Sequence, residues 1–189
     1  MLNQRARGFT LLEVLITIVI LAFGLLGLVN LQSKLHMTEM EAYQRAQAVV
    51  LLQDMINRLQ ANGANAASYL TPTPLGTGNT TENCSNPTTT VARDRCAWHA
   101  ALQGAAETVG GSNVGGMIGA RGCVQQITAP NPAAGICTPG VYRISVVWQG
   151  LFQTAAPAAA LTCGQNQYGD ESYRRVVSAD ITVGLPKCS

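Results

Sequence analysis

Cysteine and histidine are the residues of this sequence whose chemistry first needs an account. The chain contains 6 cysteines and 2 histidines. No two cysteines form the CxxC pair of structural zinc sites and thioredoxin-like redox sites. Cys96-Ala-Trp-His99 has one spacing that suits a metal, but no second such pair accompanies it. The cysteines therefore indicate disulfides in an oxidising compartment.

Sequence alone leaves many disulfide connectivities open. The loops between neighbouring cysteines contain few apolar residues, and a disulfide would stabilise each by about 2–4 kcal/mol. We therefore expect each cysteine to pair with its nearest neighbour along the chain. The expected bonds are Cys84 with Cys96, Cys123 with Cys137, and Cys163 with Cys188.

Enzyme chemistry has little support in the sequence. It contains no GxSxG elbow, no HExxH motif and no paired acids at the end of a strand. The glycine-rich segment 110–119 lacks the Lys-Ser/Thr of a phosphate-binding loop, and we interpret it as a turn. His36 and His99 fall in predicted helices and are expected to be packing or surface residues. We expect no catalytic residue, no cofactor and no metal.

The charge content argues against a nucleic-acid-binding protein. Only 12% of the residues are charged, against about a quarter in an average soluble chain, and the formal net charge is +2. Neutralising phosphates requires clustered basic residues. We interpret the dispersed arginines of the C-terminal part as a solvated surface; they are Arg93, Arg95, Arg143, Arg174 and Arg175.

Glu13 is the one ionisable residue in a long apolar segment, Phe9 to Val29. As a helix, this segment would just span a hydrocarbon core of roughly 30 Å. A lone acid there costs about 2.5–3.5 kcal/mol, so it needs a partner. Cleavage between Gly8 and Phe9 would supply one, because the new α-amine of Phe9 lies one helical turn from Glu13.

Two simpler interpretations of the segment compete with cleavage at Gly8. Arg5 and Arg7 precede it and place the N-terminus in the cytoplasm, as they would for a removed signal peptide or a permanent signal anchor. A signal peptide requires a small-residue cleavage site, and only Ala22-Phe23-Gly24 qualifies, which would leave apolar residues exposed on the product. Neither interpretation explains Glu13.

The segment Arg7 to Glu13, Arg-Gly-Phe-Thr-Leu-Leu-Glu, resembles the type III signal of type IV prepilins and pseudopilins. The resemblance implies that a prepilin peptidase cuts after Gly8 and N-methylates Phe9. It also implies that Glu13 pairs with the N-terminal amine of a neighbouring subunit during assembly. Arg5 and Arg7 would be lost with the leader, leaving equal numbers of basic and acidic side chains.

This segment differs from that of many major pilins, which carry Pro near the end of the segment. Here position 30 is Asn30, and the segment contains two glycines instead. Gly24 and Gly27 are each about 1 kcal/mol less favourable than Ala in a helix. They would let the helix loosen on leaving lipid, or let neighbouring helices approach closely. Glycine is also simply common in transmembrane helices. The sequence leaves these interpretations open.

One long helix is predicted from Phe9 to about Asn62, roughly 80 Å at the standard rise. Apolar residues recur beyond the membrane segment at three- and four-residue intervals, and Asn62-Gly63 ends the pattern. We expect this second half to pack on a sheet. A dimeric coiled coil is the weaker alternative, because the apolar positions drift. The apolar residues are Leu31, Leu35, Met40, Tyr43, Val50, Leu52, Ile56 and Leu59.

The remaining chain predicts a small α+β head. Residues 71–90 are expected to form a loop, and residues 94–103 a short helix capped by Asp94. Alternating patterns predict strands over 142–149 and 173–183, and residues 121–128 are expected to form another strand. The expected class is α+β and pilin-like: a long N-terminal helix on an antiparallel sheet of three or more strands, with a disulfide-rich head.

The expected organisation is a cleaved leader at 1–8, a transmembrane and assembly half of the helix at 9–30, a periplasmic stalk half at 31–62, and a globular head at 63–189. The protein would cross the inner membrane once, with its head in the periplasm, and then move to the pilus at the cell surface.

Four strings in the head resemble minor pilins of the PilV type, also called type IV pilus modification proteins. The resemblance implies a structural protein that joins other minor pilins and the major pilin to start or cap a pilus for adhesion and twitching motility. Prepilin peptidase and the inner-membrane assembly machinery would be further partners. A type II secretion pseudopilin is the alternative. Cys163–Cys188 also resembles the C-terminal disulfide loop of many pilins. The strings are residues 96–105, 119–123, 142–150 and 163–177.

Overall fold

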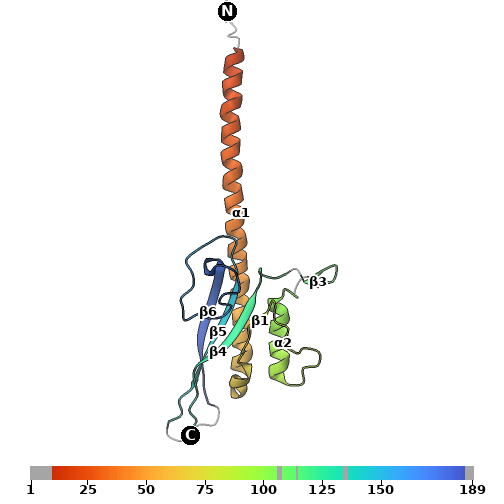
Figure 1. Ribbon diagram of the computed structural model, residues 1–189, viewed down its shortest axis with the longest axis vertical. Coiled ribbons are helices and arrows are strands. Elements are labelled where there is room, and N and C mark those ends of the chain that lie inside the picture. Colours follow the sequence, from red (N-terminus) through yellow and green to blue (C-terminus); the bar gives the residue numbers. More distant parts are fainter. Residues whose placement is uncertain (1–9, 106–107, 114, 134–135, 186–189) are drawn as a thin grey trace, which may run out of the picture. The chain divides into compact units, whose positions relative to one another are not determined.

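The computed structural model describes residues 10–105, 108–113, 115–133 and 136–185. The chain divides into two compact units, with the boundary between Met40 and Glu41. One helix, α1 (Leu11–Ala61), contributes to both units (Figure 1). It ends directly before Asn62, where a 3-10 turn (Gly63–Tyr69) follows. The predicted long helix and its end are therefore confirmed within the described residues.

The second unit is built on a four-stranded antiparallel sheet in the order β1-β4-β5-β6 (Figure 1). The three predicted strands are confirmed, and β4 has the bounds that were expected. Strand β1 was not expected, because it lies in the polar segment predicted as a loop. The strands are β1 (Leu75–Gly76), β4 (Arg121–Thr128), β5 (Gly140–Gln149) and β6 (Arg174–Val183).

A second helix, α2 (Thr90–Leu102), packs beside β1 and β4. Its cap is Thr89, whose Oγ1 accepts a hydrogen bond from the N–H of Ala92 at 3.1 Å. The prediction that Asp94 caps this helix is wrong. The Asp94 carboxylate instead accepts hydrogen bonds from the Tyr69 hydroxyl at 2.5 Å and from Arg58 Nη1 at 3.0 Å, tying α2 to the end of α1.

The glycine-rich segment forms a small hairpin between β2 (Thr108–Val109) and β3 (Ser112–Asn113). Gly110 and Gly111 make its turn with φ values of 58° and 83°, a region that favours glycine. The predicted turn is confirmed at Gly110 and Gly111, whereas strands β2 and β3 beside it were not expected. A short 3-10 turn (Glu171–Tyr173) precedes β6.

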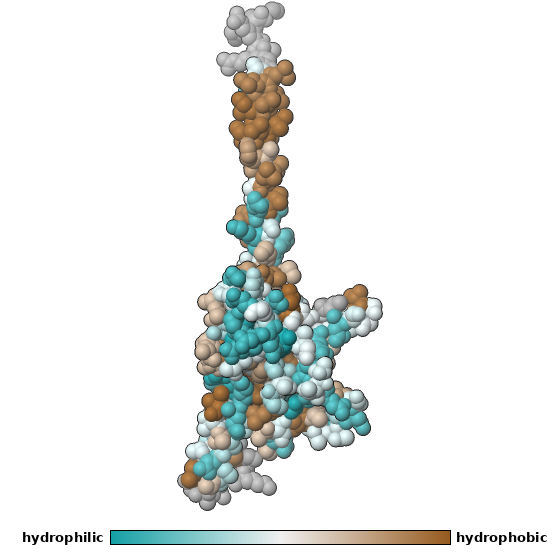
Figure 2. Space-filling view, in the orientation of Figure 1, coloured by the Kyte–Doolittle hydropathy of each residue, from teal (hydrophilic) through white to brown (hydrophobic). Residues whose placement is uncertain are grey.

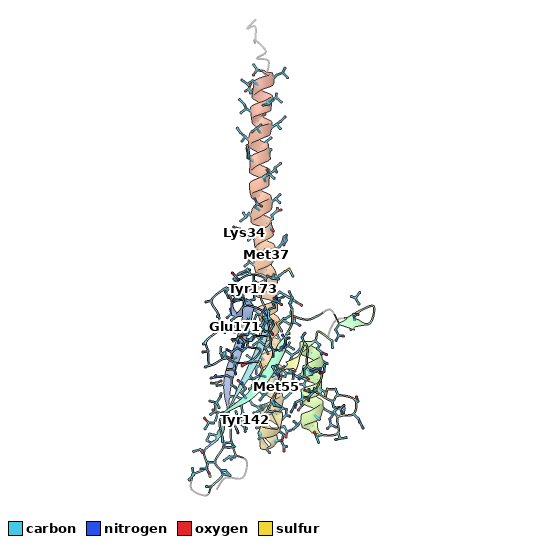
Figure 3. All side chains as sticks on the ribbon, viewed as in Figure 1. Lys34, Met37, Met55, Tyr142, Glu171 and Tyr173 are labelled. Carbon is cyan, nitrogen blue, oxygen red and sulfur yellow. A yellow bond between two sulfur atoms is a disulfide. The ribbon has the colours of Figure 1, made fainter. Side chains whose placement is uncertain are left out.

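The core of the second unit lies between α1, α2 and one face of the sheet. Figure 3 labels two of its members, Met55 on α1 and Tyr142 on β5. Leu52, Ile56 and Leu59 are buried as expected. The predicted set of buried apolar residues is wrong nearer the N-terminus of α1, because Gln44, Ala48 and Leu51 form the buried face there. The predicted members that are exposed are Leu31, Leu35, Met40, Tyr43 and Val50.

Two disulfides are described. Cys84–Cys96 is confirmed, but Cys123 bonds to Cys163, so the predicted Cys123–Cys137 and Cys163–Cys188 bonds are wrong. Cys137 is also disulfide-bonded, and Cys188 lies outside the described residues. The reason for the error is three-dimensional. Cys123 packs with Val147, Cys163 and Tyr168 in a small cluster separate from the main core.

Loss of the Cys123–Cys163 bond is expected to lower the free energy of unfolding by about 2–4 kcal/mol. It should cost more than loss of Cys84–Cys96, because it links residues 40 apart instead of 12. Urea unfolding of the full chain in detergent, with each cysteine pair replaced by serine, measures both. Equal losses from the two pairs would contradict the loop-length argument, and non-reducing peptide mapping checks the connectivity itself.

Candidate functional site

The first part of α1 is exposed and apolar. Every residue from Leu11 to Asn30, which we call the assembly segment, is exposed. Figure 2 shows this part of the helix as a continuous hydrophobic surface. In the described residues, α1 is the one helix long and apolar enough to cross a membrane, with a mean hydropathy of 2.7 over its most apolar 18 residues. This surface needs lipid or other apolar chains around it.

Glu13 lies in the first turn of α1. Its backbone N–H donates hydrogen bonds to Thr10 Oγ1 at 3.3 Å and to the Thr10 carbonyl oxygen at 3.1 Å, so Thr10 is the helix cap. This position favours a carboxylate, because the N-terminus of a helix carries partial positive charge. The described residues contain no ion-pair partner for Glu13. A cation that pairs with it must therefore come from residues 1–9 or from another molecule.

The other predicted residues of this segment divide into two groups. Gly8 and Phe9, the predicted cleavage and methylation site, lie outside the described residues. Gly24 and Gly27 lie inside α1 without interrupting it, and a Cβ added at either would meet nothing within 4 Å. Both therefore offer open helix surface to a neighbour, and their roles in loosening or close packing stay predictions.

The interpretation of a solvated surface fits Arg93, which is exposed and has no ion pair among the described residues, but most of the other arginines of the second unit are paired with acids and partly buried. Arg95 lies 2.7 Å from Glu82, Arg143 2.7 Å from Asp180, and Arg175 3.1 Å from Glu41. The charge-assisted bond from Arg143 lowers the pKa of Asp180 below its usual value. Each pair neutralises a cation that phosphate binding would require.

Arg174 departs furthest from expectation, since its side chain is only 2% exposed. It pairs with Glu171, whose pKa is lowered chiefly by this hydrogen bond. Arg174 Nη1 also donates to the carbonyl oxygens of Leu161 at 2.7 Å and Cys163 at 3.1 Å. The strand pattern identified Arg174 as polar, but it could not show that a loop would cover it.

Glu41 and Arg175 form a clamp that sequence reasoning missed. The two carboxylate oxygens of Glu41 accept hydrogen bonds from Arg175 Nε and Nη2, both at 3.1 Å, and Oε1 also accepts from the N–H of Leu151 at 2.7 Å. Both side chains are largely buried. The clamp fixes the N-terminal end of β6 to the helix, so that the sheet packs against α1 from Glu41 onward. Nothing in the spacing of the two residues indicates this pairing.

We expect His99 to make the stability of this unit sensitive to acid. Its Nδ1 accepts a hydrogen bond from the N–H of Gly76 at 3.0 Å, and burial lowers the pKa of His99 below 6.5, although Glu82 opposes this shift. The unfolded chain therefore binds the proton at a higher pH than the folded chain. Stability should be complete above about pH 6.5 and fall as the pH drops below it.

Thermal unfolding between pH 7.5 and pH 5 checks this expectation. His99→Asn, which keeps an acceptor near the Nδ1 position, should weaken the pH dependence. His36→Asn is the matched control, because His36 is an exposed residue of the first unit, and it should leave the dependence unchanged. An undiminished pH dependence in His99→Asn would show that another group is responsible.

The described ranges contain no cluster of three or more His, Cys, Asp or Glu residues that would hold a metal ion. The Cys96-Ala-Trp-His99 spacing is accounted for differently. Cys96 is bonded to Cys84, and His99 accepts a backbone hydrogen bond. Trp98 between them is fully buried and donates from Nε1 to the Leu51 carbonyl oxygen at 2.9 Å. These residues hold α2 in place.

Comparison with known proteins identifies the N-terminal segment. Residues 3–29 match the model of the prokaryotic N-terminal methylation motif. No curated protein and no solved structure matches the chain. The motif implies processing by prepilin peptidase and assembly with pilus machinery, and the apolar helix fits a membrane-anchored protein. With the α+β pilin-like fold, the motif supports a type IV prepilin-like protein of a pilus or pseudopilus, with a structural role.

Proposed function

We propose that the protein is a minor pilin, an assembly component of the type IV pilus in its initiation or tip complex. The observation that carries this proposal is Glu13, an acid in the first turn of an exposed apolar helix, for which the described residues supply no ion-pair partner. In a bundle of such helices, the N-terminal amine of a neighbour would supply the cation. Pilus-dependent adhesion and twitching motility would then depend on the protein.

The proposed life cycle begins with insertion of the precursor. Arg5 and Arg7 hold the leader, residues 1–8, in the cytoplasm, while residues 9–30 cross the inner membrane. Residues 31–62 and the head, 63–189, lie in the periplasm. Cleavage between Gly8 and Phe9 removes both arginines, and Phe9 is N-methylated. The assembly segment then exchanges lipid for the helices of other minor pilins and the major pilin, which its exposed apolar surface permits on all sides.

Within the minor pilins, we favour the PilV type. The fold supplies physical reasons for two of the sequence strings that resemble it. Trp98, in the first string, is fully buried, and a Cβ at Gly122, in the second, would lie 2.2 Å from its ring. The strings therefore include residues on which the packing of the head depends.

Replacement of Gly8 by Leu should leave the leader attached, because the peptidase must admit the backbone closely at the cleavage site. The expected result is a membrane-bound chain that keeps Met1 to Gly8 and lacks a methylated Phe9. Mass spectrometry of the intact protein measures both. Ala6→Leu places the same side chain two residues away and should still be cut. Normal cleavage of Gly8→Leu would contradict the proposed site.

Deletion of the gene separates the pilus from the secretion role. Loss of surface pili, restored by the wild-type gene, would support the minor pilin. Normal pili together with loss of exoprotein secretion would instead identify a pseudopilin of a type II secretion system, which carries the same kind of N-terminal motif.

A further inference from the structure

The last strand of the sheet, β6, has one side unpaired. It pairs with β5 through ten consecutive positions, from Gly140↔Val183 to Gln149↔Arg174, without a register shift. Figure 1 shows β6 at the end of the sheet. Across the described chain, no backbone group bonds to the other side of residues 176–183, which we call the free edge. The opposite end of the sheet is shielded as far as Val124 by β1 and Thr71.

The free edge lacks the features by which proteins usually prevent strand pairing. Such edges are short, bulged, covered, or marked by proline or lysine. Residues 176–183 contain neither proline nor lysine, and the ladder is regular. Their one charged side chain, Asp180, is neutralised by two hydrogen bonds from Arg143 at 2.7 and 2.8 Å. The edge therefore presents a row of backbone N–H and C=O groups without a repelling charge.

Side-chain burial indicates what kind of strand would fit. Val177, Ala179 and Ile181 pack against the core but are only partly buried. By contrast, two of their partners on β5, Ile144 and Val146, are fully buried. The apolar row thus remains open on the side away from β5. The alternate residues Ser178, Asp180 and Thr182 are exposed, so the other face of the edge is polar.

We propose that the free edge of β6 binds a β-strand donated by a partner protein. Only an extended backbone can satisfy a row of alternating N–H and C=O groups, which is the basis of recognition by strand addition. The partner strand would place apolar side chains toward α1, beside Val177, Ala179 and Ile181. Its alternate residues would be uncharged and polar, beside Ser178 and Thr182. This interaction goes beyond the proposed role of Glu13, and it would stand even if Glu13 proved dispensable for filament entry.

Photocrosslinking in the native host tests the proposal on the full-length chain. p-Benzoylphenylalanine at Ser178 is expected to crosslink one peptide of alternating apolar and polar residues from another protein. A second substitution, Thr182→Lys, should reduce the yield at least tenfold while leaving the melting temperature of the chain unchanged. Thr128→Lys is the matched control, because Thr128 is also an exposed threonine, at the end of β4, and it should leave the yield unchanged.

Hydrogen exchange provides the second measurement, because strand addition protects backbone amides. Alternate amides of residues 176–182 should exchange fast in the purified chain in detergent and slowly in the cell-envelope fraction. Equal exchange in both, or insensitivity of the crosslink to Thr182→Lys, would overturn the proposal. A crosslink to a helical or loop peptide would also overturn it. A crosslink to this chain's own sequence would replace the partner protein with a second copy.

Discussion

Replacement of Glu13 by Gln is expected to leave the chain in the membrane and to reduce its entry into filaments by more than about tenfold. Gln keeps the size of the side chain but cannot form an ion pair, and an unpaired amine buried in a helix bundle costs about 3–5 kcal/mol. A loss of about 1.4 kcal/mol already gives a tenfold change in an equilibrium. Immunoblots of sheared pili and of membranes, normalised to each other, measure the partition.

Glu39→Gln is the matched control for this experiment. Glu39 is also an acid on α1, but it lies outside the assembly segment, exposed beside His36 at 3.3 Å. Its loss should leave filament entry unchanged. Thr10→Ala tests the competing explanation that Glu13 acts only at the helix N-terminus, because it removes the cap but keeps the carboxylate. If Thr10→Ala lost filament entry while Glu13→Gln kept it, helix capping and not pairing would be the role of this turn.

The sequence predicted the elements well where one face alone is buried. The alternation of residues 177–183 in β6 and the three- and four-residue spacing of the C-terminal part of α1 report burial against a single layer. In β4 and β5 one-sided alternation is not the whole pattern, because Cys123, Ser145 and Val147 are buried on the second face as well. A periodic pattern shows which residues face the core, but not which loop will cover the other side.

The wrong disulfide pairing has the same origin. Cys123 belongs to the cluster that also contains Val147, Tyr168 and Cys163, and these residues meet only when the chain beyond β5 folds over the sheet. Arg174 secures that segment through two backbone carbonyls. Spacing along the chain favoured Cys137 as the partner of Cys123, whereas the contact is set by long-range packing. Glu41 and Arg175 were missed for the same reason.

The packing of the head also explains the second large effect that we expect. Gly122 lies buried in β4 between Leu75 of β1 and Val146 of β5. A Cβ added there would lie 2.2 Å from Cη2 of Trp98, a separation that real Cβ atoms do not show. Since β4 is held on both sides by its neighbours, the Trp98 ring must move. Its movement would break the bond to the Leu51 carbonyl oxygen and expose the largest side chain of the core.

Gly122→Ala is therefore expected to lower the free energy of unfolding by about 3–5 kcal/mol, as much as the loss of a large buried side chain. That is a large part of the stability of a typical domain. Gly184→Ala is the control, because a Cβ there meets nothing within 4 Å, and it should change the stability by less than about 0.5 kcal/mol. Urea unfolding of the full chain in detergent, followed by fluorescence, gives both values.

A double-mutant cycle assigns the effect to the Trp98 ring. Trp98→Leu removes the atoms that the new methyl group would meet, so Gly122→Ala should cost far less in that background than in the wild type. Trp148 remains as the fluorescent probe in both backgrounds. If the cost of Gly122→Ala were the same with and without Trp98, the strain would lie in the β4 backbone. The contact between helix α2 and the sheet would then not be the reason for glycine at this position.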